Sequence, residues 1–130
     1  MTTTGKTDKT FGSVLVVGGG IGGIQTSLDL VEAGFKVYMV ESSPAIGGVM
    51  AQLDKTFPTN DCSMCILSPK LVSCGRNQNI EIITNAEVTH VTGRPGNFKA
   101  NVNVYPRYVD PKLCTGCGTC MQYCPVHCIS

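Results

Sequence analysis

The chain has 130 residues, of which 42% are hydrophobic and 15% are charged, with no tryptophan. This composition is typical of globular proteins and excludes disordered and fibrous classes, and the length suits one domain or one domain with a fragment of another. The net charge of +1 gives no electrostatic basis for binding nucleic acid or an anionic membrane surface, so neither partner is expected.

The first residues are polar, and residues 1–12 are expected to form a disordered tail rather than a signal peptide. No apolar run approaches the roughly 18 residues that a membrane-spanning helix needs, so a cytoplasmic protein is expected. The chain carries eight cysteines. In a chain without an export signal they indicate metal-binding or redox thiols rather than a disulfide framework.

Residues 13–41 have the pattern of a strand–helix–strand unit. The β-branched run Ser13–Val17 predicts a strand, and an amphipathic stretch after it predicts a helix as far as Ala33. Gly34 is the expected C-terminal stop of this helix, and Lys36–Val40 is the next predicted strand.

A glycine loop lies between the first strand and the helix. Gly18, Gly20 and Gly23 satisfy the G-x-G-x-x-G spacing, and Gly22 belongs to the same loop. In such loops the first glycine makes the turn, the second lets the backbone approach a pyrophosphate, and the third permits close helix–strand packing. Glu41 ends the second strand, where a carboxylate accepts hydrogen bonds from a ribose and repels a 2′-phosphate, which favours FAD or NAD over NADP. The alternative is a tight turn of any α/β protein with Glu41 as a solvated strand end.

Residues 42–79 are rich in glycine and proline and are expected to be mostly loop, with one short helix around Pro69–Ser73. Gly47 and Gly48 follow Glu41 after a short loop. This arrangement resembles the segment that lies along FAD in flavoproteins with two dinucleotide-binding domains, and it places FAD ahead of NAD as the expected cofactor.

Cys62 and Cys65 form a C-x₂-C pair within this region. Such a pair forms a redox disulfide or supplies cluster ligands, and the alternative is two buried cysteines that pack beside Ile66 and Leu67. The spacing does not choose among these readings. The two cysteines are the redox candidates of the chain, and no residue is assigned as a general acid or base.

A third strand and a β-hairpin are expected next. Ile80–Thr84 is the predicted strand, and Glu87–Thr92 and Lys99–Tyr105 alternate around the turn at residues 93–97. The predicted class is therefore α/β, a Rossmann-like FAD-binding βαβ unit with a β-hairpin, followed by the start of a ferredoxin-like [4Fe-4S] segment.

The C-terminal cysteines have the strongest pattern in the sequence. Cys114, Cys117, Cys120 and Cys124 form the run C-x₂-C-x₂-C-x₃-C-P of bacterial ferredoxins and are the predicted ligands of a [4Fe-4S] cluster. Zinc is the alternative metal, although zinc sites usually pair two separated C-x₂-C elements. In two-cluster ferredoxins the fourth cysteine ligates the other cluster, so Cys124 either closes a single cluster or belongs to a second one. Because the sequence holds no second run, this segment is expected to be incomplete.

Several blocks together resemble one family, the A-type subunit of heterodisulfide reductase. The blocks are Val14–Glu41, Ile46–Gly48, Met50–Thr59, the D-C-S-x-C-I-L-x-P-K run of Asp61–Lys70, and Arg107–Asp110 before the cysteine run. The resemblance implies a FAD-containing iron–sulfur protein whose thioredoxin-reductase-like flavin domain holds an inserted ferredoxin domain. It also implies electron bifurcation in a complex with other subunits, and an electron donor or acceptor such as ferredoxin or hydrogenase.

The expected organisation is a partial FAD-binding domain at 13–106 and a ferredoxin-type segment at 107–130. The expected function is electron transfer between FAD and [4Fe-4S] clusters within an oxidoreductase, because a flavin exchanges one or two electrons and a cubane exchanges one. Two alternatives remain open. One is a non-catalytic electron carrier or a split subunit that needs a second polypeptide, and the other is a zinc-stabilised interaction module.

Overall fold

The computed structural model describes residues 12–110 and 112–125. The predicted tail at 1–12 therefore lies, apart from Gly12, outside the described residues. The elements, in chain order, are β1 (Ser13–Val17), α1 (Ile21–Glu32), β2 (Lys36–Glu41), the 3₁₀ helix η1 (Gly48–Gln52), α2 (Ser63–Arg76), β3 (Ile80–Thr84), β4 (Ala86–Arg94), β5 (Asn97–Val104) and α3 (Thr119–Tyr123).

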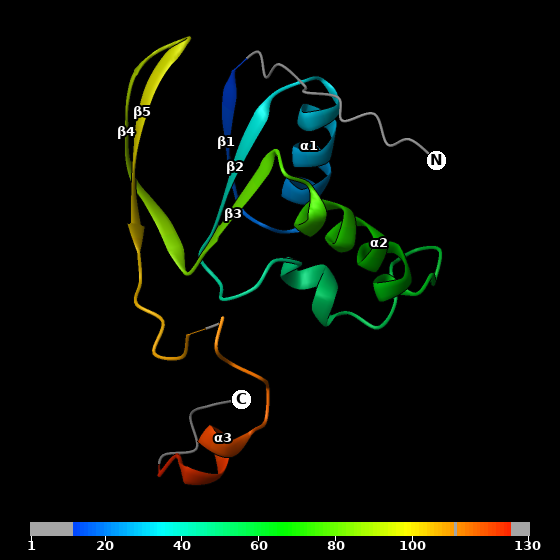
Figure 1. The fold of residues 1–130 in the computed structure, drawn as a ribbon. Helices are drawn as coiled ribbons and strands as arrows, with labels where there is room; N and C mark the ends of the chain where they lie inside the picture. The colour runs from blue at the N-terminus through cyan, green and yellow to red at the C-terminus, as the bar shows by residue number, and fades with distance from the viewer. Residues whose placement is uncertain (1–11, 111, 126–130) are drawn as a thin grey trace, which may run out of the picture.

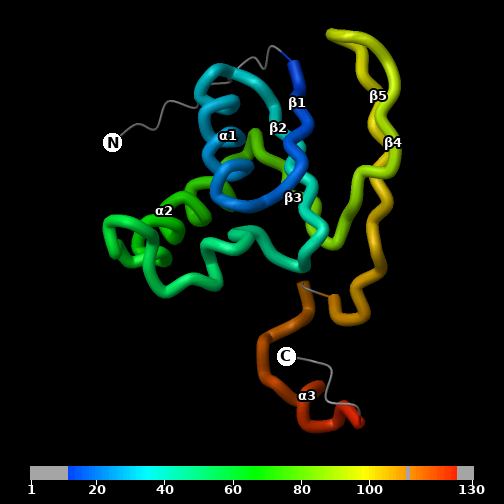
Figure 2. Tube along the Cα trace, turned by 180° about the vertical axis from the view of Figure 1, so that it is seen from behind, coloured from blue at the N-terminus to red at the C-terminus, as the bar shows by residue number. Residues whose placement is uncertain are grey.

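A three-stranded parallel sheet is the centre of the fold. Its order is β1–β2–β3, and the register pairs Val16 with Met39 and Val40 with Ile83. The central strand β2 is buried along most of its length, as expected for a parallel strand covered on both faces. Helices α1 and α2 cover one face of the sheet, and the β4–β5 hairpin lies on the other side (Figures 1 and 2). This arrangement confirms the predicted α/β class.

The core lies between the sheet and the two helices. Its buried residues come from β1, α1, β2, α2 and β3, and they are Val16, Ile24, Val37, Met39, Leu67, Cys74 and Ile80. The predicted strands at 13–17 and 80–84 are confirmed, and the second strand extends one residue further, to Glu41.

Helix α1 ends as its sequence predicts. The Gly34 N–H donates to the Val31 carbonyl at 2.9 Å and the Phe35 N–H donates to the Leu30 carbonyl at 3.0 Å. These two bonds are the Schellman pattern, which needs a left-handed residue after the last turn, and Gly34 has φ of 92°. The chain thereby reverses and enters β2.

The prediction of a short helix at Pro69–Ser73 is wrong in length, because α2 runs for 14 residues around Pro69. Proline in a helix interior removes one backbone hydrogen bond and costs about 3 kcal/mol. The buried side chains of Leu67 and Cys74, with Leu71 half-buried between them, lie at helical spacing and pack against the core. This packing holds the helix together through the proline. The sequence also did not predict η1.

The predicted hairpin is confirmed, with longer strands than expected. β4 and β5 pair antiparallel from Ala86↔Val104 to Arg94↔Asn97, with a bulge between Val88 and His90. At the start of β4, Ala86 is buried and Val88 is half-buried, whereas most hairpin side chains are exposed. Among the described helices none is both long and apolar enough to cross a membrane.

Candidate functional site

The glycine loop joins the carboxyl end of β1 to the N-terminus of α1. Gly18 has φ of 103° and its N–H donates to the Val40 carbonyl at 2.8 Å, which ties the turn to the neighbouring strand. A Cβ on Gly23 would lie 1.9 Å from the Gly18 carbonyl oxygen. A side chain at position 23 would therefore push the helix away from the strand, as expected for the third glycine of such a loop.

Gly20 and Gly22 of the loop face open space. A Cβ on Gly20 or on Gly22 would meet no heavy atom within 4 Å. The amides of the first turn of a helix have no acceptor within the helix, so α1 presents N–H groups and a partial positive charge at this end. The loop has the shape and polarity of an anion site, with room for a pyrophosphate to approach the backbone at Gly20.

Glu41 anchors this loop from the end of β2. Its Oε2 accepts the Gly19 N–H at 2.5 Å, and its Oε1 accepts the Ser43 N–H at 2.8 Å and the Ser42 hydroxyl at 3.3 Å. The residue is only 8% exposed. The hydrogen bond from the Ser43 backbone is the main cause that holds the pKa of Glu41 below its ordinary value. The Gly19 amide acts in the same direction, and burial opposes both.

The interpretation of Glu41 as a solvated strand end is therefore wrong. The carboxylate is ionised and buried, and it holds the glycine loop and the next loop in place. A carboxylate oxygen accepts two hydrogen bonds, so Oε2 can accept a ribose hydroxyl in addition to the Gly19 amide.

The second glycine pair lies directly against the first loop. The Gly47 N–H donates to the Gly19 carbonyl at 2.7 Å, and Gly47 forms a parallel bridge with Gly20. A Cβ on Gly48 would lie 3.0 Å from the Gly20 Cα, so a larger residue would push the two loops apart. The structure thus brings together the glycine loop, Glu41 and the glycine pair, although they come from separate parts of the sequence.

A cavity of about 290 Å³ opens beside this arrangement. It lies at the carboxyl ends of β1 and β2 and reaches the start of β4, and its lining residues are Val17, Gly18, Val40, Ser42, Ala86, Glu87 and Val88. The crevice at the carboxyl ends of parallel strands is where α/β sheets bind nucleotides. The open glycines, the carboxylate and this cavity fit the adenosine diphosphate half of FAD.

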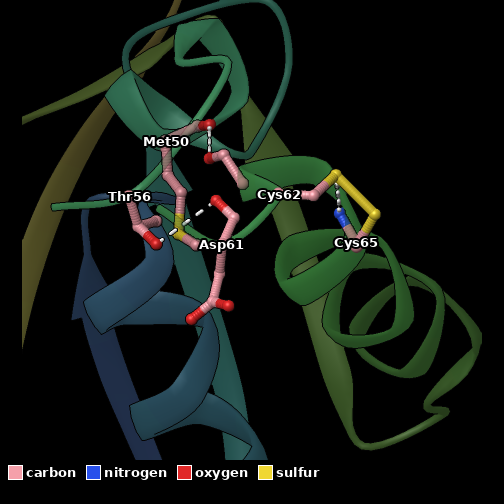
Figure 3. The surroundings of a disulfide bond; sticks show 6 residues. Met50, Thr56, Asp61, Cys62 and Cys65 are labelled. Carbon is pink, nitrogen blue, oxygen red and sulfur yellow. Dashed lines mark hydrogen bonds between the residues drawn. A yellow bond between two sulfur atoms is a disulfide. The ribbon is translucent and has the colours of Figure 1, made fainter. Parts of the chain in front are cut away.

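Cys62 and Cys65 form a disulfide at the N-terminus of α2 (Figure 3). Their Cα atoms are 5.3 Å apart, and the Cys65 N–H donates to the Cys62 sulfur at 3.2 Å, so Cys62 caps the helix with its side chain. Both cysteines are exposed. The alternative of a buried, apolar-like pair is therefore wrong.

The four predicted cluster ligands lie near the end of the chain. Cys114, Cys117 and Cys120 are exposed and Cys124 is half-buried. Among residues 12–110 and 112–125, no group of three or more Cys, His, Asp or Glu side chains is gathered as a metal site. The structure places the four cysteines along one segment of the described chain, with no three of them gathered as a metal site.

The local backbone and the donor set nevertheless suit a cluster. Gly116 and Gly118 have φ of 70° and 75°, left-handed values that let the chain turn between successive cysteines. The Thr119 hydroxyl oxygen lies 3.2 Å from the Cys117 sulfur, and hydrogen bonding to Thr119 lowers the pKa of the Cys117 thiol. Four closely spaced thiols are the donors that iron–sulfur clusters use.

Arg107 is a contact residue to which the sequence assigned no role. Its guanidinium donates to the Thr84 hydroxyl and to the Pro44 carbonyl, the latter at 3.5 Å. The Tyr105 N–H also donates to the Asn85 carbonyl, at 2.7 Å. The segment that leads to the cysteine run is thus attached to the loops at the carboxyl ends of β2 and β3. The only sequence signal was the place of Arg107 in the block Arg107–Asp110.

One known protein family matches the C-terminal segment, which carries the cysteine run. The family described as "4Fe-4S binding domain" matches residues 107–130. Part of this match, residue 111 and residues 126–130, lies outside the described residues.

Most of the chain is similar to relatives of much greater length. It is 62% identical over 112 residues to the A-type polypeptide of the H(2):CoB-CoM heterodisulfide,ferredoxin reductase of Methanothermobacter thermautotrophicus, covering 86% of this chain and 17% of that protein. It is 59% identical over 114 residues to the first of two A-type iron–sulfur polypeptides of the CoB–CoM heterodisulfide reductase of Methanopyrus kandleri, covering 88% of this chain and 17% of that protein. The chain therefore spans about 17% of the length of these curated relatives.

A solved structure supports the fold. The chain superposes on L-proline dehydrogenase from P. horikoshii with a TM-score of 0.57 and 24% identity, over 71% of this chain and 19% of that one. The likeness shows a shared fold over that part of the chain. The sequence matches identify the chain as a member of the family of A-type heterodisulfide reductase subunits, of which it covers a segment.

Proposed function

We propose that the chain is a flavin and iron–sulfur electron-transfer component of an oxidoreductase. The observation that carries this proposal is the contact between the two glycine turns, with Glu41 bonded to the first, beside a cavity at the carboxyl edge of the sheet. The C-terminal match to a 4Fe-4S binding domain adds a second redox group to the same chain.

The proposed FAD site is made of both loops. The backbone of Gly18, Gly20, Gly22 and Gly23 would face the pyrophosphate, with Gly47 and Gly48 packed along the same side. Glu41 would accept a ribose hydroxyl at Oε2 and disfavour a 2′-phosphate through its charge. FAD, once bound, supplies a centre that exchanges either one or two electrons. The residues of both glycine loops would orient it.

The proposed cluster ligands are Cys114, Cys117, Cys120 and Cys124. We assign residues 13–106 to the flavin-binding part and 107–130 to the iron–sulfur part. The hydrogen bonds of Arg107 support a fixed point of attachment between the two. A fixed attachment matters because electron transfer between two groups depends on the distance between them.

The names of the relatives suggest the setting. Each is named as one subunit of a reductase, and the Methanothermobacter name includes ferredoxin and dihydrogen. We propose a cytoplasmic complex in which other subunits, and ferredoxin or a hydrogenase, exchange electrons with this chain.

Anaerobic purification tests the proposal. We expect FAD in the released chromophore, and iron with acid-labile sulfide in the protein. Cys117→Ser should lower the iron content because a thiolate ligand is lost, while Thr115→Ser, in the same turn, should not. A protein with iron but no FAD would support the alternative of a non-catalytic electron carrier. A protein with zinc but no acid-labile sulfide would support the alternative of a zinc-stabilised interaction module.

A further inference from the structure

The exposed disulfide at the start of α2 is a chemical group that the flavin and cluster sites do not use. It is held by a small, well-bonded platform. The Ser63 hydroxyl donates to the Met50 carbonyl at 2.6 Å, and the Ser63 N–H donates to the Asp54 carbonyl at 3.1 Å. These bonds fix the first turn of α2 against η1 and the loop after it (Figure 3).

The loop before the disulfide is tied on its other side. Lys55 forms an antiparallel bridge with Cys62, and the Thr56 N–H donates to the Asp61 carbonyl at 2.9 Å. Ser63 itself is fully buried, and Leu67 on the next turn belongs to the core. The backbone that carries the two sulfur atoms is therefore rigid, while the two cysteines themselves are exposed.

The environment of the pair distinguishes its two members. Cys62 caps the helix and its sulfur accepts the Cys65 N–H, so a negative charge on the Cys62 sulfur is stabilised by an amide and by the positive end of a 14-residue helix. Cys65 lies within the first turn, away from the capping position. When a thiol attacks the Cys65 sulfur, the stabilised Cys62 thiolate is the better leaving group. A disulfide of this kind is suited to exchange with thiols.

The residues near the pair are both charged and apolar, since Asp61 precedes Cys62 and Lys55 forms a bridge with it. Met64 and Ile66 flank Cys65 and are both partly exposed, and Phe57, in the loop that precedes Cys62, is 95% exposed. Because both cysteines are exposed, small thiols and disulfides can reach them from solvent.

We propose that Cys62 and Cys65 are a thiol–disulfide exchange site, whose substrates are small-molecule dithiols and disulfides. In the reducing direction, the Cys62 thiolate attacks a disulfide R–S–S–R, a bond forms between its sulfur and one R–S sulfur, and R–S⁻ leaves. The Cys65 thiolate then attacks the Cys62 sulfur, the intramolecular disulfide forms, and the second R–S⁻ leaves. Two electrons pass from the dithiol to the substrate, and the two thiolates released take up the protons that the cysteines lost.

The first test is a redox titration of the whole chain under argon. The protein is equilibrated in buffers of reduced and oxidised dithiothreitol, and free thiols are then alkylated. Mass spectrometry measures the mass of the proteolytic peptide that carries both cysteines. We expect a single two-electron transition between the disulfide and the doubly alkylated form. A peptide that stays oxidised, or stays reduced, in every buffer would overturn the proposal.

The second test uses a matched pair of variants. Cys65→Ser leaves the proposed attacking cysteine without its partner, so oxidised glutathione should trap it as a mixed disulfide, whereas Cys62→Ser should form this adduct about ten-fold more slowly. Cys74 is the internal control, because it is fully buried and burial raises the pKa of its thiol, so it should remain unmodified. Equal trapping in the two variants would contradict the assigned roles.

Iron analysis separates this proposal from ligation of a cluster. If the pair exchanges thiols, Cys62→Ser and Cys65→Ser should retain the iron and sulfide content of the parent chain. A fall in iron, or protection of both thiols until iron is chelated, would show that the pair ligates metal and would overturn the proposal. Neither outcome depends on whether FAD binds at the glycine loop.

Discussion

At the scale of single residues, the glycines of the first loop have different tasks that the structure separates. Gly23 is needed for packing, because its missing side chain lets α1 approach the Gly18 carbonyl. Gly20 has an extended conformation and faces open space, so the fold does not need glycine there. A requirement for glycine at position 20 would therefore reflect a ligand.

This difference gives a prediction for Gly20→Val. We expect a folded protein whose affinity for FAD falls by about ten-fold or more, because the valine occupies the space that the pyrophosphate needs. Titration with FAD, followed by flavin fluorescence, measures the affinity, and circular dichroism checks the fold. Gly22 also faces open space but is the second residue of α1, so Gly22→Ala is the control and should weaken FAD binding less. Equal FAD affinity in the parent chain and Gly20→Val would remove the proposed role of the loop.

Glu41 gives a prediction for stability against pH. The pKa of its carboxyl is lower in the folded chain than the ordinary value of 4.5, so the folded state favours the ionised form. The resulting stabilisation is fully present above pH 4.5 and is lost as the pH falls through the lower pKa of the folded state. Glu41→Gln should thus reduce the free energy of unfolding by about 1–2 kcal/mol at about pH 7, and by much less near pH 3.

Urea denaturation at about pH 7 and about pH 3 measures this difference for the parent chain and for Glu41→Gln. Glu32→Gln, on the exposed surface of α1, is the control and should change little at either pH. A penalty for Glu41→Gln that stays the same at both values of pH would show that the charge does not anchor the loop.

At the scale of elements, α2 contacts the glycine pair Gly47–Gly48 as well as the core. Leu67 is fully buried, and the position of a Cβ on Gly47 would be 3.6 Å from its side chain. Helix α2 therefore packs against the glycine pair, and Gly47 is in turn hydrogen-bonded to the glycine loop.

Leu67→Ala should lower the free energy of unfolding by about 3 kcal/mol, because it removes buried methyl groups and leaves a cavity. It should also weaken FAD binding, since the Gly47 loop loses its support. Val72→Ala, on the exposed side of the same helix, should cost about 0.5 kcal/mol or less. Chemical denaturation of both variants tests the prediction, and equal losses would place Leu67 outside the core.

At the scale of the whole molecule, the question is how the cysteine-bearing segment is attached to the α/β unit. The described contacts pass through Tyr105 and Arg107, which bond to the loops after β2 and β3. These loops flank the same edge of the sheet as the proposed FAD site. The attachment thus fixes where the segment leaves the α/β unit.

Arg107→Ala should release this segment without loss of its cluster. Loss of about 1 kcal/mol of hydrogen bonding corresponds to about a five-fold rise in local opening, so chymotrypsin should cleave near Tyr105 and Tyr108 about five-fold faster. Electron transfer between the reduced flavin and the cluster should slow, while iron content stays unchanged. Arg94→Ala, at the turn of the hairpin, is the control for loss of an arginine. Unchanged cleavage and transfer rates would remove Arg107 from the attachment.

The sequence by itself determined the features that depend on local spacing. The strand–helix–strand unit, the glycine loop, the stop at Gly34 and the hairpin follow from patterns in which neighbouring residues set the backbone, and the structure has all of them. The pattern of the C-terminal cysteines is local in the same sense, and the match to a 4Fe-4S binding domain covers it. The assignment of the individual site residues stays a prediction.

Only the tertiary structure decided what depends on contacts between distant segments. It extended α2 through Pro69, because burial of one helix face against the core outweighs the local cost of the proline. It showed that Glu41, which the sequence assigned only to a ribose hydroxyl, accepts a hydrogen bond from the glycine loop. It also placed the Cys62–Cys65 pair at the start of a helix that hydrogen bonds hold in place. Such contacts join residues far apart along the chain, and their free energies arise from burial and from hydrogen bonds that no local pattern encodes.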